Sequence, residues 1–339
     1  MDERNFQKNE LEPLITVGIP VYNGGSTLSS CIDSLKMQTY TNLEILIFDN
    51  CSEDNTREIS ERAQSADERI RYHLSDKNLG TVHSFSSLLG LANGKFFMWA
   101  AADDLRPPDY VEQAFLHLQA NPEASLSAPV TEGYVEGIDE PIYRVKVPNF
   151  EQRKGYISRT YMYLTNLPAT AIYGLFRTEE AKETLGWRRS IATDVAFLFE
   201  IALRGKIVSN NDQVLVMNRR KMWNTIDDDY RVFFGDEKLH RNWPPFIQLT
   251  IDRIRRALRA PKSLFLRTLT VLLIFACELR RLTFMTVVKI LRRVLSEKIF
   301  EASVLKLYWA FIHQSNVEVL DRDVYEKRMV LQRYGVRKS

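Results

Sequence analysis

Two adjacent carboxylates, Asp103 and Asp104, follow a run of apolar residues at positions 96–101. Such a run predicts a buried strand, being too short for a helix, and Pro107 and Pro108 prevent the strand from continuing. Neighbouring carboxylates repel each other unless a cation lies between them. Mg²⁺ and Mn²⁺ prefer oxygen ligands, and the phosphates of a ligand can complete their shell. The pair therefore indicates a metal site, and the alternative is an Asp-Asp turn at the surface.

Strands and helices must alternate along the chain to place this pair. Apolar runs predict strands at residues 14–19, 43–48, 70–74 and 96–101. Helical patterns separate them: an apolar face at positions 28, 31, 32 and 35, and further helices at 56–66 and 82–92. This order is typical of a parallel sheet built from βαβ units. Because polar clusters follow each strand, we expect them to meet at one edge of the sheet, where α/β proteins bind ligands.

The loops after these strands carry motifs that resemble one family when taken in order. They are Ile-Pro-Val-Tyr-Asn at 19–23, Gln-Thr-Tyr-Thr-Asn-Leu-Glu-Ile at 38–45, Phe-Asp-Asn-Cys-Ser-Glu-Asp-Asn-Thr at 48–56, Asn-Leu-Gly at 78–80 and Ala-Asp-Asp at 102–104. From residue 15 to about residue 112 the chain resembles the family 2 glycosyltransferases. The resemblance implies the GT-A fold, an α/β, Rossmann-like, mixed and mostly parallel sheet flanked by helices.

The resemblance also implies roles for individual residues. Nucleotide-sugar binding would fall on Pro20, Tyr22, Asn23, Asp49, Asn78 and Asp103, and Mn²⁺ or Mg²⁺ would bind Asp104 together with Asp103. For the nucleotide base, the chemistry agrees with these roles. The carboxylate of Asp49 can accept a hydrogen bond from the imide N–H that uracil and thymine have and cytosine lacks. A tyrosine ring can stack on the base. The alternatives are a turn-capping role for Asp49 and simple packing for Tyr22.

A second candidate for chemistry is Asp194, at the start of an apolar segment that ends at Gly205. The segment predicts a helix that begins at Thr193 or Asp194. It is similar to the family's Glu-Asp helix, whose Asp is the proposed general base of inverting members. A base must lie within hydrogen-bond reach of the hydroxyl that it deprotonates. The alternative is an acidic residue that the helix dipole favours.

Some positions depart from the family pattern. Ala101 and Thr193 stand where many members have an acidic residue, and Phe85 stands where the family often has an Arg. The stretch at 218–226 holds three consecutive cations and a Trp, which could close over the leaving diphosphate. A solvated basic loop is the alternative, and the His that the family frequently has in this region is absent from the stretch.

Composition and charge divide the chain. With 339 residues, 45% hydrophobic and 26% charged, it is an ordinary globular protein. Three cysteines without metal-ligand spacing indicate reduced thiols in the cytoplasm. The first ten residues lack the apolar core of a signal peptide, and the apolar stretch 268–277 is too short to span a bilayer. Residues 251–339 hold 19 Lys and Arg against 8 Asp and Glu, whereas the remainder holds 27 against 35.

These features predict three regions. A flexible N-terminus at 1–12 precedes a GT-A domain at 13–243, with a nucleotide-binding half at 13–112 and an acceptor-binding half at 113–243. Residues 244–339 form a basic, amphipathic helical region. Its partner is an anionic membrane surface, which would make the protein peripheral at the inner face of the membrane, or the catalytic domain, or a second copy of the chain. Nucleic acid is not expected, since no binding motif accompanies the charge.

The sequence thus predicts an inverting, metal-assisted glycosyltransferase of the hexosyltransferase type. Its donor would be a nucleotide-diphospho-sugar, with uridine as the expected nucleoside, and its acceptor a glycan or a lipid-linked glycan in polysaccharide or glycolipid assembly. Two alternatives remain open: a nucleotide-sugar-binding subunit without turnover, and a sugar nucleotidyltransferase. The second is disfavoured because the loop at 22–25 lacks the basic residue of a phosphate-binding loop.

Overall fold

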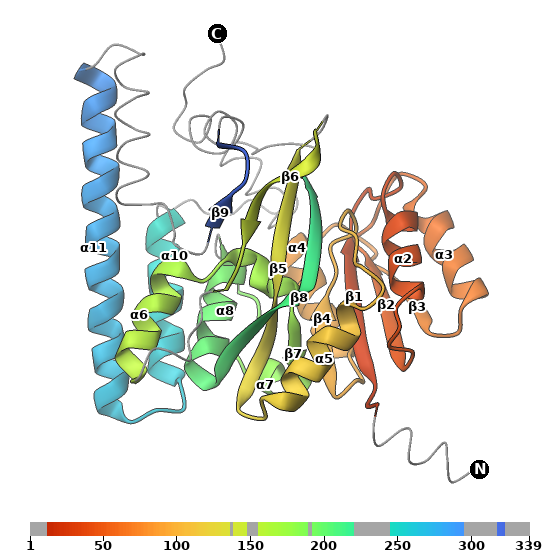
Figure 1. The fold of residues 1–339 in the computed structure, drawn as a ribbon, viewed down its shortest axis with the longest axis horizontal. Helices are drawn as coiled ribbons and strands as arrows, with labels where there is room; N and C mark the ends of the chain where they lie inside the picture. Colours follow the sequence, from red (N-terminus) through yellow and green to blue (C-terminus); the bar gives the residue numbers. More distant parts are fainter. Residues whose placement is uncertain are drawn as a thin grey trace.

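The structure is a computed structural model and describes residues 12–135, 138–147, 155–188, 192–219, 245–294 and 317–322. Strands and helices alternate in its first part (Figure 1): β1 (Ile15–Val21), α2 (Leu28–Lys36), β2 (Leu43–Asp49), α3 (Thr56–Ala66), β3 (Ile70–Leu74), α4 (Thr81–Leu91) and β4 (Phe96–Trp99). The predicted elements of this part are confirmed to within two residues at each end. The apolar runs and helical faces in the sequence are long enough to distinguish strands from helices.

The second part is less regular. It comprises α5 (Tyr110–Ala120), β5 (Ala124–Val135), β6 (Ile138–Val145), α6 (Tyr156–Asn166), η1 (Ala169–Tyr173), β7 (Leu175–Arg177), α7 (Thr178–Lys182), α8 (Thr193–Arg204) and β8 (Lys206–Arg219). Residues 169–177 form a 3₁₀ turn, η1, followed by the short strand β7. At Gly174, between them, a Cβ would lie 2.3 Å from the carbonyl oxygen of Ser127. Only a glycine therefore lets the chain pass this close to β5.

One mixed sheet runs through the molecule in the order β3-β2-β1-β4-β7-β5-β6, with β9 (Val317–Val319) at its end and β8 beside β5. β1 pairs in parallel with β2 and β4, and β2 with β3. The pairings of β7 with β4 and β5, and of β6 with β5 and β9, are antiparallel. Because β1, β2 and β4 point the same way, the loops that follow them meet at one edge, as expected.

Helices cover both faces of this sheet, and each face has an apolar core. Side chains of α2, α3 and α5 form one core, and those of α4, α6 and α8 form the other. The second core is rich in aromatic rings: Trp99 is fully buried and its ring centroid lies 5.7 Å from Phe85, 5.5 Å from Trp187 and 5.4 Å from Phe197. Three segments that are distant in sequence therefore meet around β4.

The C-terminal region packs against the second face. Helix α10 (Pro245–Arg259) lies beside α8, and α11 (Leu264–Val294) stands at the edge of the molecule next to α10 and α6 (Figure 1). The region predicted as helical also supplies β9, which extends the sheet through β6. Within the described residues, no helix is both long and apolar enough to cross a membrane.

Candidate active site

A cleft of about 400 Å³ opens at the carboxyl ends of β1 and β4. This volume is in the range of small-molecule sites, roughly 300–1,000 Å³. Its lining brings together five residues that the sequence singled out, Pro20, Tyr22, Asn23, Asp103 and Asp194. Among the described residues, the other three predicted site residues, Asp49, Asn78 and Asp104, lie outside this lining.

The loop after β1 holds Tyr22 at the rim of the cleft. Tyr22 is 46% exposed. Asn23 has a φ of 51°, in the left-handed region that Asn tolerates better than most residues. Its backbone N–H donates to Ser52 Oγ at 2.9 Å, and its Oδ1 accepts the N–H of Glu53 at 2.9 Å. The loop is thus tied to the segment after β2, and the Tyr22 ring is available to a ligand.

Asp49 and Asn78 shape the neighbouring loops. Asp49 is fully buried; its Oδ1 accepts the N–H of Ser52 at 2.8 Å and its Oδ2 the hydroxyl of Tyr72 at 2.9 Å. Asn78 Oδ1 accepts the side-chain amide of Asn50 at 2.8 Å and the N–H of Gly80 at 2.9 Å. Both residues order the loops beside the cleft, and their contacts with a nucleotide stay predictions.

The two aspartates after β4 differ in their surroundings. Asp103 is exposed and lines the cleft, whereas Asp104 is only 3% exposed. Close by, the buried guanidinium of Arg106 donates to the carbonyl oxygen of Trp99 at 3.4 Å and lies 5.6 Å from the centre of the Tyr110 ring. This cation offsets part of the negative charge of the pair.

Cys31 lies against the same segment, with its Sγ 3.3 Å from the carbonyl oxygen of Ala101. Burial raises the pKa of its thiol to about 11. Arg106 opposes that rise in the pKa, and the charges of Asp104 and Asp103 add to it. At neutral pH Cys31 is therefore a protonated thiol that packs in the core.

A divalent metal fits this donor set only together with a ligand. No group of three or more His, Cys, Asp or Glu residues in the described parts of the chain is arranged to hold a metal ion. Asp103 and Asp104 supply the carboxylate oxygens that Mg²⁺ and Mn²⁺ prefer, and phosphate oxygens and water can supply the rest. The residues present therefore suit a cation that arrives with a diphosphate.

Asp194 also lines the cleft, at the second position of α8. The residue as a whole is half-buried. Burial raises the pKa of this carboxyl, and the backbone N–H groups of Asp194 and Val195 limit the rise in its pKa. A raised pKa makes the carboxylate a stronger proton acceptor, which is the property required of a general base.

Most of the residues that line the cleft lie in a stretch that matches a known protein family. Residues 16–173 match the family described as "Glycosyl transferase family 2". Residues 16–173 are a family 2 glycosyltransferase domain. An uncharacterized glycosyltransferase of Haemophilus influenzae is 32% identical over 124 residues, which are 37% of this chain and 38% of that protein. The chain thus spans well under half of the length of this relative.

Two solved structures share the GT-A fold of the glycosyltransferase domain. S. aureus TarS 1-349 in complex with UDP-GlcNAc superposes with a TM-score of 0.53 at 17% identity, over 76% of this chain and 70% of that one. The mannosyltransferase PcManGT of Pyrobaculum calidifontis, in complex with GDP-Man and Mn²⁺, superposes with a TM-score of 0.51 at 18% identity. The superposition covers 77% of this chain and 70% of that one. The likeness confirms the expected fold.

Aromatic residues that the sequence analysis did not assign to the site form one wall of the domain's cleft. They are Tyr173, Trp187 and Phe85. The centroids of the Phe85 and Trp187 rings lie 4.2 Å apart, and Phe85, on α4, stands where an Arg was expected from the family pattern. This wall is therefore apolar. The sequence held one signal for this wall: Trp187 follows Gly186 in the segment that leads to the helix of Asp194.

The basic stretch at 218–226 cannot be placed at the cleft, because only its first two residues belong to the described chain, and the side chains of these two do not. Residues 1–11, most of the cations beyond residue 281 and the segment 295–316 also lie outside the described residues. The prediction of a loop over the diphosphate stays untested.

Proposed function

We propose that the protein transfers a sugar from a nucleotide-diphospho-sugar, with UDP as its nucleotide, to a hydroxyl group of a glycan or lipid-linked acceptor. The observation that carries the proposal is that Asp103 and Asp194 line the same cleft. The first belongs to the nucleotide-binding half of the domain and the second to the predicted acceptor half. A donor and an acceptor hydroxyl can therefore meet between them.

Each side of the cleft supports one part of this reaction. Tyr22, exposed at the rim, would offer its ring to the base, and Asp103, in the lining of the cleft, would lie toward the ribose and the diphosphate. Asp103 and Asp104 would hold a Mn²⁺ or Mg²⁺ ion with the donor. When bound, such an ion neutralises the charge of the leaving diphosphate. The fold of a mannosyltransferase bound to Mn²⁺ supports this expectation by analogy.

Asp194 is the proposed general base. Its carboxylate removes the proton of the acceptor hydroxyl as the oxygen attacks the anomeric carbon opposite the diphosphate, which inverts the configuration. The bond from the anomeric carbon to the diphosphate breaks, and the nucleoside diphosphate leaves with that electron pair. The apolar wall of Phe85 and Trp187 beside the base keeps competing water away from the anomeric carbon.

Calorimetric titration of UDP, with and without Mn²⁺, tests the proposal on the wild type and on Asp104→Ala. We expect Mn²⁺-dependent binding in the wild type and a large loss of that dependence in the variant. Donor turnover is then measured with UDP-sugars and with Asp194→Asn. UDP binding without any transfer or hydrolysis would favour a binding subunit, and release of pyrophosphate from UTP and a sugar phosphate would favour a nucleotidyltransferase.

A separate surface supports a location at a membrane. Helix α11 carries exposed Leu and Phe side chains at spacings of three, four and seven residues, namely Phe265, Leu272, Phe275, Leu279 and Leu282. From 253 to 294 the sequence has eleven Lys and Arg and a single acidic residue, Glu278. Such a basic amphipathic helix suits the surface of an anionic bilayer. We therefore propose peripheral membrane binding through α11, which would bring a lipid-linked acceptor to the enzyme.

A further inference from the structure

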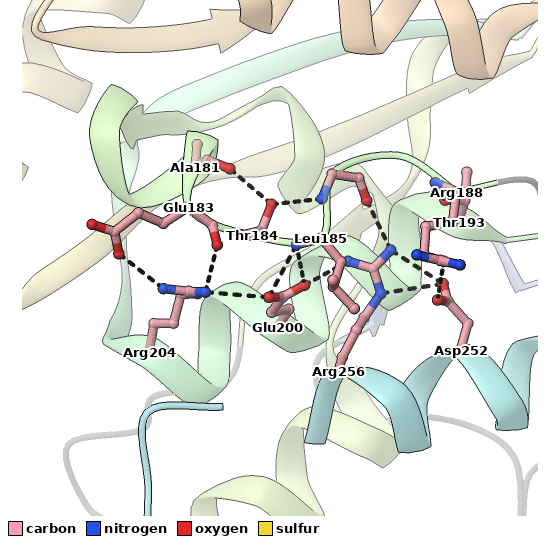
Figure 2. A network of polar contacts seen from close by, with 11 residues as sticks. Ala181, Glu183, Thr184, Leu185, Arg188, Thr193, Glu200, Arg204, Asp252 and Arg256 are labelled. Carbon is pink, nitrogen blue, oxygen red and sulfur yellow. Dashed lines mark hydrogen bonds and ion pairs between the residues drawn. The ribbon is translucent and has the colours of Figure 1, made fainter. Parts of the chain in front are cut away.

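Outside the cleft, helix α8 carries a buried carboxylate. Glu200 is 1% exposed although it lies in the apolar run between Phe199 and Ile201. Its carboxylate accepts the backbone N–H of Leu185 at 3.0 Å and lies 2.7 Å from Arg256 Nη1 and 3.4 Å from Arg204 Nη2 (Figure 2). A charge at this depth is stable only when it is paired and hydrogen-bonded.

Its partner Arg256, on α10, contacts two other segments at once as well as its own helix. Its side chain is completely buried. Besides Glu200, it binds the carbonyl oxygen of Gly186 through Nη2 at 2.8 Å and Asp252 Oδ2 through Nε at 3.1 Å (Figure 2). Gly186 has a φ of 64°, so the turn at this point needs a glycine and cannot easily take another shape. One guanidinium of the C-terminal region thus holds α8 and this turn together.

Both segments continue directly into the cleft. Trp187, which follows Gly186, lines the cleft. Arg188 comes next: its N–H donates to Thr193 Oγ1 at 3.1 Å, and its Nε lies 3.4 Å from Asp252 Oδ1. Thr193 is the residue before Asp194. The network therefore reaches the aromatic wall from one direction and the start of α8 from the other.

We propose that Arg256 is a positioning residue for the reaction. Through Gly186 and Glu200 it sets the places of Trp187 and Asp194, so that α10 belongs to the acceptor side of the active site. This inference rests on the proposed transferase function. The nucleotide side of the cleft, formed by the loops after β1 and β4, has no member in the network drawn in Figure 2. Arg256 should thus affect catalysis and not donor binding.

The chain offers a matched control on the same helix. Arg253 is 7% exposed, and its Nη1 lies 3.2 Å from Glu278 Oε1 on α11. Within the described residues, its ion pair joins α10 to α11 and does not reach α8 or the turn at Gly186. Arg253→Gln therefore takes an arginine from one buried carboxylate, Glu278, and Arg256→Gln takes one from two, Glu200 and Asp252, but only the second substitution reaches the wall of the cleft.

The experiment compares these variants with the wild type well below their melting temperatures. We expect Arg256→Gln to lower kcat roughly 10- to 100-fold, since small misplacements of reacting groups cost about that much. The Kd for UDP with Mn²⁺ and the KM for the donor should stay unchanged. The pH at which kcat declines on the acid side should move, because the surroundings of Asp194 change. Arg253→Gln should keep the wild-type kcat and pH profile.

Arg256→Lys keeps the charge but lacks the fork that reaches Glu200 and Gly186 together, so it decides the question if Arg256→Gln does not fold. A kcat for Arg256→Lys equal to that of the wild type overturns the proposal, as does an equal loss in Arg253→Gln and Arg256→Gln. A wild type that binds no UDP and transfers no sugar would instead refute the proposed function, and the two failures are thus distinct.

Discussion

The hydroxyl of Tyr72 on β3 donates to Asp49 Oδ2, at the end of the neighbouring β2, over 2.9 Å. The N–H of Ser52 binds the other carboxylate oxygen at 2.8 Å. Asp49 is thereby fixed and kept as an acceptor at the base of the loop that leads to Asn23. If it also accepts the imide N–H of uracil, its charge and not Tyr72 should govern the affinity for UDP.

Asp49→Asn tests that role. A hydrogen bond to a charged group contributes about 1.5–3 kcal/mol, so we expect the variant to bind UDP roughly 10- to 100-fold more weakly by calorimetry. Tyr72→Phe is the control, because it removes the contact within the fold and leaves the carboxylate in place. Wild-type affinity in Asp49→Asn would assign Asp49 to loop structure alone.

The pH dependence of turnover follows from the raised pKa of Asp194. Only the ionised carboxylate accepts a proton, so activity should fall as the pH drops through its pKa. Because burial raises that pKa, the fall should begin at a higher pH than for an ordinary aspartate, whose pKa is 3.8. Removing the base should lower kcat about 10²- to 10⁴-fold. A profile of kcat against pH that keeps its acid limb in Asp194→Asn would place the titrating group elsewhere.

At neutral pH, ionised Asp194 should lower the free energy of unfolding. Its pKa is higher in the folded than in the unfolded chain, so the protonated form favours folding. The free energy of unfolding should therefore decline as the pH rises from about 3.8 through the raised pKa, and stay lower above it. We expect Asp194→Asn to melt at a higher temperature than the wild type at neutral pH, with the difference shrinking toward pH 3.8. Equal melting temperatures at neutral pH would contradict this account.

The elements around the cleft were predictable and the wall was not. Strands such as β1 and β4 are apolar runs bounded by polar loops, and their parallel order brings Tyr22 and Asp103 to one edge. Trp187 follows a turn that Arg256 of α10 binds, and that contact joins residues 70 positions apart in sequence. One signal was present: Glu200 stands in an apolar helical run, where an acidic residue needs a buried cation.

The basic C-terminal region shows what amino-acid composition alone cannot predict. The excess of Lys and Arg after residue 250 predicted a region that acts on its own, with three possible partners. Arg256 and Arg253 are buried in ion pairs within the fold, so a share of that charge serves packing against α8 and α11. Sequence counts do not separate buried from exposed cations, and only the remaining cations are available to an outside partner.

The last prediction concerns membrane binding through α11. Leu272 is 59% exposed and Leu279 is 67% exposed, one heptad apart on the same face. Burying a leucine in an apolar medium contributes about 1.5–3 kcal/mol, so Leu272→Glu with Leu279→Glu should abolish co-sedimentation with phosphatidylglycerol vesicles. Leu116→Glu is the control, because Leu116 is 47% exposed on α5. It should sediment with the vesicles like the wild type.

Neutral phosphatidylcholine vesicles should retain little of either protein, since the cations around α11 contribute only at an anionic surface. The competing occupant of this face is a second copy of the chain. In that case the wild type would sediment as a dimer in the ultracentrifuge without lipid, and the double variant as a monomer. A wild-type dimer that ignores phosphatidylglycerol would therefore assign the exposed leucines to self-association and refute the membrane proposal.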